Sequence, residues 1–172
     1  MRRGSSNRVR LFLLLTLPLY VLDQWTKWLV IRHIEFGDGF AVINGLFDLV
    51  HVHNTGAAFG SFGNSNTFFI FLSAATLCVL AVCAWRGLFR ERFARIGVAL
   101  LASGVLGNLT DRVIHRHVID FLDFYVGRHH WPAFNVADSC ICIAAGLFIL
   151  GSLREQKEPV LRSSSSSSGE IS

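Results

Sequence analysis

The sequence predicts an all-α membrane protein with four transmembrane helices and a small extracytoplasmic β-structure. Three observations support this prediction. Hydrophobic residues make up 52% of the 172 residues and charged residues only 16%, whereas soluble domains carry about 25% charged residues. The apolar residues gather in four blocks, each close to the ~20 residues that a helix needs to cross a bilayer. Lysine and arginine are distributed unevenly between the segments that join these blocks, as is typical of multi-pass proteins.

The four blocks are interpreted as helices because backbone polar groups must find partners inside lipid. The predicted spans are residues 11–30, 67–85, 93–109 and 134–153. The first block follows a basic start, as a signal peptide would. However, its apolar run is long, no small-residue cleavage site follows, and three more spans come after it. We therefore expect it to be retained, and residues 1–157 to form a single four-span membrane domain.

The positions of lysine and arginine predict the orientation of the chain. Basic residues precede the first span, lie between the second and third, and follow the fourth, where Arg154, Lys157 and Arg162 are found. The positive-inside bias makes that side cytoplasmic, so both termini are expected in the cytoplasm. All seven histidines fall on the opposite side. Topology accounts for the net charge of +4, and the basic residues lack the pattern of a nucleic-acid surface.

The segment of residues 31–66, between the first two spans, is predicted to contain β-structure. Its stretch "FAVINGLFDLVHVHN" is rich in β-branched and aromatic residues around Asn44-Gly45, and Asn-Gly is a strong hairpin signal. We expect a short curved hairpin or sheet on the outer face of the membrane. At the other end of the chain, residues 158–172 contain a serine run and are predicted to be disordered.

Neither the cysteines nor the histidines indicate a metal site. The four cysteines lie within predicted spans two and four, at Cys78, Cys83, Cys140 and Cys142. We interpret them as small apolar packing residues and expect no structural disulfide. His115 and His117, followed by His129 and His130, lack the ligand spacing of a metal centre, so interfacial histidines are the better interpretation. We expect neither a metal nor a cofactor.

Several polar residues lie in or near the predicted spans. Asp23 and Lys27 are four residues apart and share a helix face, so they can neutralise each other; both a structural pair and a role in a site are open. Asp111-Arg112 lies just after the third predicted span and is interpreted as a cap and salt bridge. Asn54 lies near the end of the exported segment, where it can serve a turn or offer its amide to a bound chain.

Two aspartates are the strongest candidates for chemistry. Asp138 lies about one turn inside the fourth predicted span, and Asp120 lies between spans three and four on the same exported side. Two carboxylates that share a site cannot easily both ionise, so the pair holds one proton. Such a pair can act as general base and general acid in peptide hydrolysis.

The residues alone leave two alternatives to a protease. Paired acids could relay protons in a small carrier, or they could be structural parts of a non-enzymatic membrane assembly factor. A carrier would predict acids deep in the bilayer and an internal repeat, and the sequence has neither.

Five motifs occur in order along the chain. They are "DQWTK" (23–27), "HNTGAAF" (53–59), "GNLTDR" (107–112), "HVIDF" (117–121) and "FNVADS" (134–139). Together, over the chain up to about Leu153, they resemble the lipoprotein signal peptidase family, also called signal peptidase II, the aspartyl proteases of the bacterial cytoplasmic membrane. The resemblance implies cleavage of a prolipoprotein signal peptide immediately before a cysteine that carries diacylglycerol.

The resemblance also implies roles for particular residues. The catalytic dyad falls on Asp120 and Asp138, a choice that residue chemistry alone could not make against Asp111 and Asp123. The supporting residues would be Asp23, Lys27, Asn54, Gly56, Asn108, Asp111, Arg112 and Asn135. The exported segment would form the β-cradle of the family, and residues 121–131 would form its short periplasmic-side lid helix.

The family implies a location and a set of partners as well. The protein would be a multi-pass protein of the bacterial cytoplasmic (inner) membrane with its active site at the extracytoplasmic face. Its partners would be diacylglyceryl-prolipoproteins, membrane lipids and inhibitors of the globomycin type, with no metal. This chain departs from the family pattern at Ser103, where glycine is common, and at His53, where an aromatic residue is frequent before Asn54.

Overall fold

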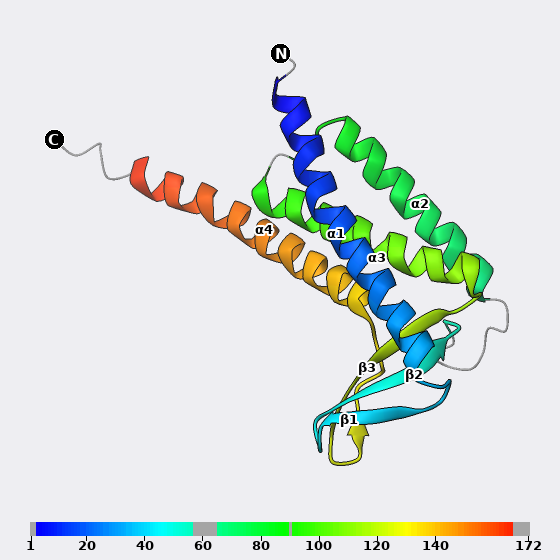
Figure 1. Ribbon diagram of the computed structural model, residues 1–172. Helices are drawn as coiled ribbons and strands as arrows, with labels where there is room; N and C mark the ends of the chain where they lie inside the picture. The colour runs from blue at the N-terminus through cyan, green and yellow to red at the C-terminus, as the bar shows by residue number, and fades with distance from the viewer. Residues whose placement is uncertain (1–2, 57–64, 90, 167–172) are drawn as a thin grey trace.

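Long helices and a small antiparallel sheet make up the structure, which is a computed structural model describing residues 3–56, 65–89 and 91–166 (Figure 1). In chain order the elements are α1 (Arg3–His33), β1 (Gly39–Ile43), β2 (Phe47–Asn54), α2 (Ser65–Trp85), α3 (Arg92–Ile114), β3 (Val118–Val126), β4 (His129–His130) and α4 (Val136–Ser166). The sheet lies at one end of the helices, where α1 ends and α4 begins.

Three helical segments in the described part of the chain are long and apolar enough to cross a membrane. They are Asn66–Trp85, Arg92–Ile114 and Val136–Arg154, and they correspond to the second, third and fourth predicted spans. The first predicted span lies within α1, a helix of 31 residues. That α1 also crosses the bilayer stays a prediction.

The helix α4 extends further than the sequence predicted. It continues to Ser166, past the expected end at Leu153 and into the stretch 158–172 that we expected to be disordered. Lengthening an existing helix needs no new nucleation, so a helix that begins in an apolar span can continue into polar sequence. Residues 167–172 lie outside the described part, and their disorder stays a prediction.

Helix α3 is central because it contacts α1, α2 and α4. Small residues permit this close packing. A Cβ atom on Gly104 would collide with the carbonyl oxygen of Ala137 in α4, and one on Gly107 would lie 2.5 Å from Asp23 Oδ2 of α1. The outward surfaces of the helices are strongly apolar: Leu14, Val21, Phe71, Val79 and Ile149 are each at least 60% exposed.

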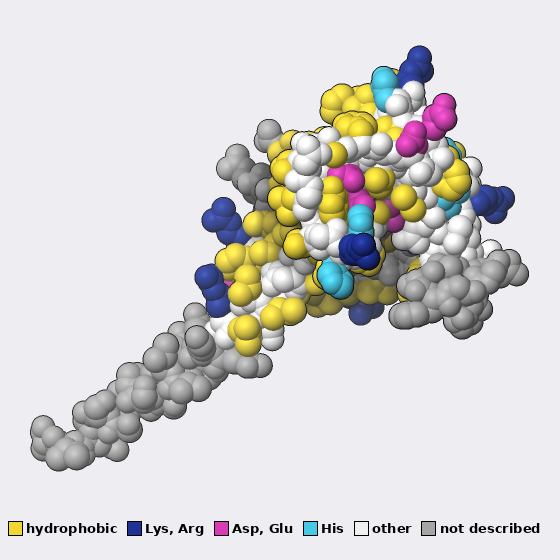
Figure 2. Space-filling model, turned by 90° about the horizontal axis from the view of Figure 1, so that it is seen from below, with side chains coloured by type: hydrophobic (Ala, Val, Ile, Leu, Met, Phe, Trp, Pro, Cys, Tyr) yellow, Lys and Arg dark blue, Asp and Glu magenta, His cyan; other side chains and the backbone are white. Residues whose placement is uncertain are grey.

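The predicted hairpin is confirmed. Strands β1 and β2 are antiparallel and meet at Asn44-Gly45, where Gly45 has a φ of +81° that glycine adopts without strain. The full sheet has the order β1-β2-β3-β4. Figure 2 views this end of the molecule and shows acidic and histidine side chains among apolar ones.

The predicted lid helix at residues 121–131 is wrong. This segment forms most of β3, the turn after it, and β4. Residues 118–126, "VIDFLDFYV", are rich in β-branched and aromatic side chains, which favour a strand. They also pair with β2 along almost its whole length, from Phe47 opposite Phe124 to Asn54 opposite Val118. The extended strand therefore gains a ladder of backbone hydrogen bonds that a short helix would forgo.

A small apolar core joins the sheet to the helices. It consists of Val30 and Ile34 from the end of α1 and Ile119 and Phe121 from β3. Because Ile119 and Phe121 are buried here, the intervening residue Asp120 points to the other side of the strand. The core thus fixes the direction in which β3 presents its carboxylate.

Candidate active site

Asp120 and Asp138 come together where β3 and the start of α4 meet. Asn135 contacts both of them: its Nδ2 donates to Asp120 Oδ1 at 2.7 Å, and its backbone N–H donates to Asp138 Oδ2 at 3.3 Å. In return, Asn135 Oδ1 accepts the backbone N–H of Asp138 at 2.9 Å. These reciprocal bonds between residues three apart form a capping box, so the local sequence "NVAD" both starts α4 and fixes the Asp138 side chain.

Asp120 is almost completely buried, with 2% of its surface exposed. Its Oδ2 accepts a hydrogen bond of 2.9 Å from Asn54 Nδ2, in addition to the bond from Asn135. Burial, followed by the charge of Asp138, raises the pKa of Asp120 from 3.8 to about 6, against the opposing effects of the two amides and of Lys27. The side chain can therefore change its protonation state close to neutral pH, as a general acid or base requires.

The amide of Asn54 is held in one orientation. Its Oδ1 accepts the backbone N–H of Gly56 at 2.8 Å, so its Nδ2 must face Asp120. Gly56 has a φ of +83°, a conformation that glycine adopts readily. The rest of this motif, residues 57–59, lies outside the described residues.

Asp138 receives its own amide donor from α3. Asn108 Nδ2 lies 2.8 Å from Asp138 Oδ1, while Asn108 Oδ1 accepts from Lys27 Nζ at 3.1 Å. Because an ammonium group can only donate, Lys27 fixes the orientation of the Asn108 amide. Asp138 is only half-buried, so one side of the pair remains accessible.

A buried ionic triad lies beside the two aspartates. Lys27 Nζ is 2.9 Å from Asp23 Oδ2 and 2.7 Å from Asp111 Oδ2, and all three side chains are at most 2% exposed. Asp23 Oδ1 accepts the N–H of Ala137, and Asp111 Oδ2 accepts that of Ile119. Each acid thus binds the residue that directly precedes one of the paired aspartates, and the triad sets their relative position.

The predicted Asp23–Lys27 pair is confirmed, but the predicted salt bridge between Asp111 and Arg112 is wrong. Adjacent residues of a helix point in different directions, and Asp111 turns towards Lys27 of α1. The guanidinium of Arg112 instead lies 4.8 Å from the ring centroid of Phe69 in α2. Its charge still interacts with those of the aspartates at the site.

Sequence reasoning missed Gln24. Its Nε2 lies 3.0 Å from Asp111 Oδ1, 3.2 Å from Asp23 Oδ2 and 3.3 Å from the carbonyl oxygen of Gly107. Gln24 therefore supplies neutral donors to both acids of the triad. Its place inside "DQWTK", next to a buried acid on a helix, was the available signal, but only packing against α3 reveals its partners.

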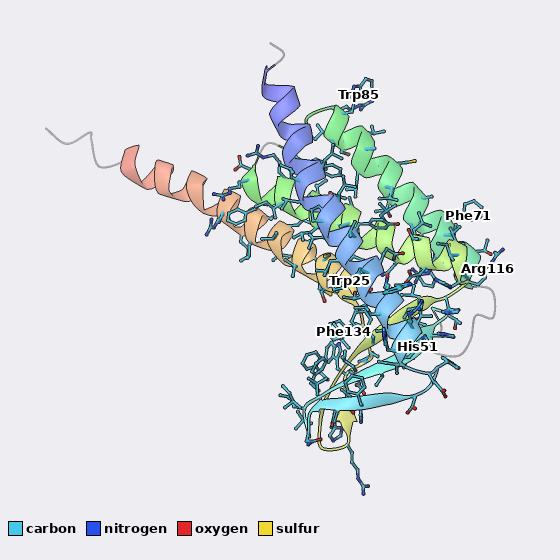
Figure 3. All side chains as sticks on the ribbon, viewed as in Figure 1. Trp25, His51, Phe71, Trp85, Arg116 and Phe134 are labelled. Carbon is cyan, nitrogen blue, oxygen red and sulfur yellow. The ribbon has the colours of Figure 1, made fainter. Side chains whose placement is uncertain are left out.

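Asp123 lies elsewhere on the sheet. It is opposite Asp48 of β2, and its Oδ2 contacts His130 Nδ1 at 2.9 Å. Phe134 lies at the point where the chain leaves the sheet for α4 (Figure 3). Its carbonyl oxygen accepts from the N–H groups of Phe121 and Leu122, which ties the start of α4 to β3.

Metal binding is not indicated by the side-chain clusters. Within the described ranges, no group of three or more histidine, cysteine, aspartate and glutamate side chains could hold a metal ion. That the site functions without a metal or cofactor stays a prediction. The arrangement instead suits acid–base chemistry, with two close carboxylates, fixed amide donors, and one carboxyl group whose pKa lies near neutrality.

The chain is similar to proteins of known activity and structure. The family described as Signal peptidase (SPase) II matches residues 15–154. A lipoprotein signal peptidase of Nitratidesulfovibrio vulgaris (strain DP4) is 44% identical over 87% of this chain and 93% of its own length. One from Neisseria meningitidis serogroup C (strain 053442) is 39% identical over 92% of this chain and 98% of its own length.

A solved structure agrees with these matches. A bacterial membrane enzyme determined by the in meso method at 2.3 Å superimposes with a TM-score of 0.79 at 30% identity, covering 87% of this chain and 92% of its own. Both the sequence and the fold lead to one conclusion: this chain belongs to the signal peptidase II family.

Proposed function

We propose that the chain is an aspartic endopeptidase that cleaves the signal peptide of diacylglyceryl-modified prolipoproteins immediately before the lipidated cysteine. Membership of the signal peptidase II family supports proteolysis, and the relatives called lipoprotein signal peptidase support prolipoprotein substrates. The observation that carries the aspartic mechanism is the joint binding of Asp120 and Asp138 by Asn135.

The proposed reaction uses the pair with one proton. The ionised carboxylate accepts a proton from a water molecule as that water attacks the scissile carbonyl carbon. The protonated carboxyl group donates its proton as the carbon–nitrogen bond breaks and the amine leaves. The amides of Asn54, Asn108 and Asn135 hold the carboxylates without supplying protons, and burial strengthens these contacts.

The proposed membrane arrangement has four spans, with α1 as the first. The exposed apolar side chains of α1 support this, since Leu14 and Val21 are each 60% exposed. Trp25 and Trp28 are 55% and 50% exposed near the end of α1 that joins the sheet, and tryptophan is enriched at membrane interfaces. In this arrangement both termini are cytoplasmic, and the site lies at the outer face of the bacterial cytoplasmic membrane.

The substrate is proposed to bind partly through its lipid. Each methylene group buried from water contributes about 0.8 kcal/mol, so two acyl chains supply much of the binding free energy. Membrane lipids would surround the helices, and inhibitors of the globomycin type would occupy the dyad. The alternative of a proton-coupled carrier is not supported, because the family and relatives are peptidases.

The direct test is cleavage of a synthetic lipobox peptide by the purified protein. The diacylglyceryl peptide should be cut before its cysteine, and the same peptide without lipid should be cut at least 100-fold more slowly, because roughly 3 kcal/mol of lost binding corresponds to that factor. Equal turnover of the two peptides would contradict the substrate assignment.

Matched variants test the dyad. Asp120→Asn and Asp138→Asn should each reduce turnover to background, since an amide of nearly equal volume can neither accept nor donate the required proton. Asp123→Asn is the control, because Asp123 lies on the same strand as Asp120 but contacts His130 instead, and it should keep most activity. Well-folded Asp120→Asn or Asp138→Asn protein that cleaves like the parent would refute the assignment.

A further inference from the structure

A group of stacked aromatic rings lies where the end of β2 meets the start of β3. The ring centroids of His53 and His117 are 3.6 Å apart with an interplanar angle of 24°, and Phe36 stacks on His53 at 4.0 Å and 25°. We call Phe36, His53 and His117 the histidine stack. His51 meets His53 edge-on at 5.1 Å, and His115 lies 6.0 Å from His117.

The histidine stack backs the two strands that carry the site. His53 directly precedes Asn54 in β2 and pairs with Ile119 in β3, which directly precedes Asp120. Side chains alternate between the two faces of a strand. His53 therefore lies on the face of the sheet opposite to the Asn54–Asp120 hydrogen bond of 2.9 Å. From that face it packs against the strand segments that carry Asn54 and Asp120.

His51 is buried beside the stack and held by the end of α1. His51 is 5% exposed, and its Nδ1 contacts the carbonyl oxygen of Ile34 at 2.9 Å (Figure 3). Its Nε2 has no hydrogen-bond partner within the described part of the chain. The Nδ1 contact fixes the His51 ring against the end of α1, edge-on to His53.

Burial and the neighbouring histidines lower the pKa of His53 and His117, and one aspartate opposes this for His117. Burial, followed by His117, His51 and His115, lowers the pKa of His53 from 6.5 to about 4. Burial, followed by His115, also lowers the pKa of His117, while Asp111 of α3 opposes this. Since the pKa of each group is lower in the folded state, the stack is most stable above pH 6.5 and loses stability as the pH falls towards 4.

We propose that the histidine stack is a positioning element that holds Asn54 against Asp120, and that it does so only while its histidines are neutral. Protonation pushes like charges apart at a ring separation of 3.6 Å and loosens the pairing of β2 with β3 beside the dyad. His53 and His117 are positioning residues, because they act through Asn54 and contact no reacting atom. At position 53, the stacking of an aromatic ring holds Asn54 in place, and a charge on that ring is not needed.

Hydrogen exchange tests this without any substrate. Protection of the backbone amides of Val52–Asn54 and Val118–Asp120, corrected for intrinsic exchange, should fall roughly tenfold or more between pH 7 and pH 5 in the parent protein. His53→Phe keeps the stacking ring without a titratable group and should retain most of its protection at pH 5. His129→Phe, which changes an exposed histidine of β4 outside the stack, should behave like the parent.

Equal loss of protection in the parent and in His53→Phe would overturn the proposal. So would constant protection of the parent across this pH range. Hydrogen exchange does not depend on the proposed function. Its result can therefore be interpreted even if the assignment of the dyad fails.

Activity gives a second readout, which rests on the proposed function. At pH 7, His53→Ala should lower kcat about tenfold with little change in KM, since the stack lies on the face of the sheet opposite to the Asn54–Asp120 bond, and His53→Phe should restore kcat. His53→Phe should also lose less activity than the parent as the pH falls from 6.5 towards 4. An alanine variant with the parental kcat at pH 7 would overturn the proposal, as would a phenylalanine variant no better than alanine. If His53→Ala does not fold, the comparison of His53→Phe with the parent still decides the question.

Discussion

The carboxyl group of Asp120 should control how cleavage responds to alkaline pH. Burial, and then Asp138, raises its pKa to about 6, so Asp120 is protonated below that pH and ionised above it. If cleavage needs one proton on the pair, kcat/KM should fall as the pH rises through about 6, because kcat/KM reports the free protein.

Asn54→Ala tests whether the pKa of Asp120 sets this alkaline limb. The Asn54 amide stabilises the ionised form of Asp120, so its removal should raise the pKa further and move the alkaline limb of the kcat/KM profile to higher pH, even as kcat falls. A limb that stays in place or moves to lower pH would show that another group controls it.

Lys27 should be far more important for stability than an exposed cation of the same helix. Lys27→Met leaves Asp23 and Asp111 buried without their counter-charge, which typically costs about 3–5 kcal/mol. Arg32→Met removes an exposed guanidinium that lies 5.5 Å from the Trp28 ring and should cost at most ~1 kcal/mol. Thermal unfolding in detergent measures both, and similar losses for the two variants would argue against a structural role for the triad.

The contact between α1 and α3 depends on the absence of a side chain at Gly107. Gly107→Ala introduces a Cβ 2.5 Å from Asp23 Oδ2 and 3.2 Å from the Cβ of Ala137, so Asp23 must move away from Lys27 or from the start of α4. We expect activity to fall at least tenfold, because Ala137 directly precedes Asp138 and small shifts in position reduce rates strongly.

Gly146→Ala is the control for the same substitution. Nothing lies within 4 Å of a Cβ at Gly146 in α4, and alanine favours a helix over glycine by about 1 kcal/mol. This variant should keep its activity and be equally or more stable. A Gly107→Ala protein that matches it in cleavage would mean that α3 and α1 tolerate separation at the site.

The elements that the sequence predicted well are those with a strong local signal. The apolar runs of α2, α3 and α4 were visible as spans, and Asn44-Gly45 gave the hairpin. Residues 121–131 were misjudged because the expectation of a lid helix came from the family, while the local "VIDFLDFYV" pattern and its pairing with β2 favour a strand. Pairing between distant strands leaves little trace in one sequence.

The site was partly predictable for a similar reason. Asp23 and Lys27 lie four residues apart on one helix, so their pairing follows from helix geometry. Asp111 and Gln24 find their partners across the α1–α3 contact, which depends on how closely Gly107 allows the helices to approach. The aspartate pair itself was assigned from motifs. Residue chemistry does not distinguish Asp120 and Asp138 from Asp111 and Asp123, and only their packing shows which two lie together.

The whole molecule should insert with its sheet outside the cell membrane. A reporter fused after Glu158 should report the cytoplasm, and one inserted at Gly45 in the β1–β2 turn should report the extracytoplasmic side, since the basic residues that follow α4 and lie between α2 and α3 favour the inner face. An alkaline phosphatase and a cytoplasmic reporter at each position would measure this. Both positions on the same side would rule out three spans between Gly45 and Glu158.

The shared ammonium group of Lys27 also constrains how this protein can change over evolutionary time. One cation pairs with two acids. Replacing either acid by asparagine still leaves the other acid paired, whereas replacing the lysine first leaves both acids without a counter-charge. The order of substitutions therefore matters: after Asp23→Asn or Asp111→Asn, a change at Lys27 leaves one buried acid without its counter-charge, whereas the reverse order leaves two. A lineage that replaces Lys27 should carry the record of an earlier neutral residue at one of the two acidic positions.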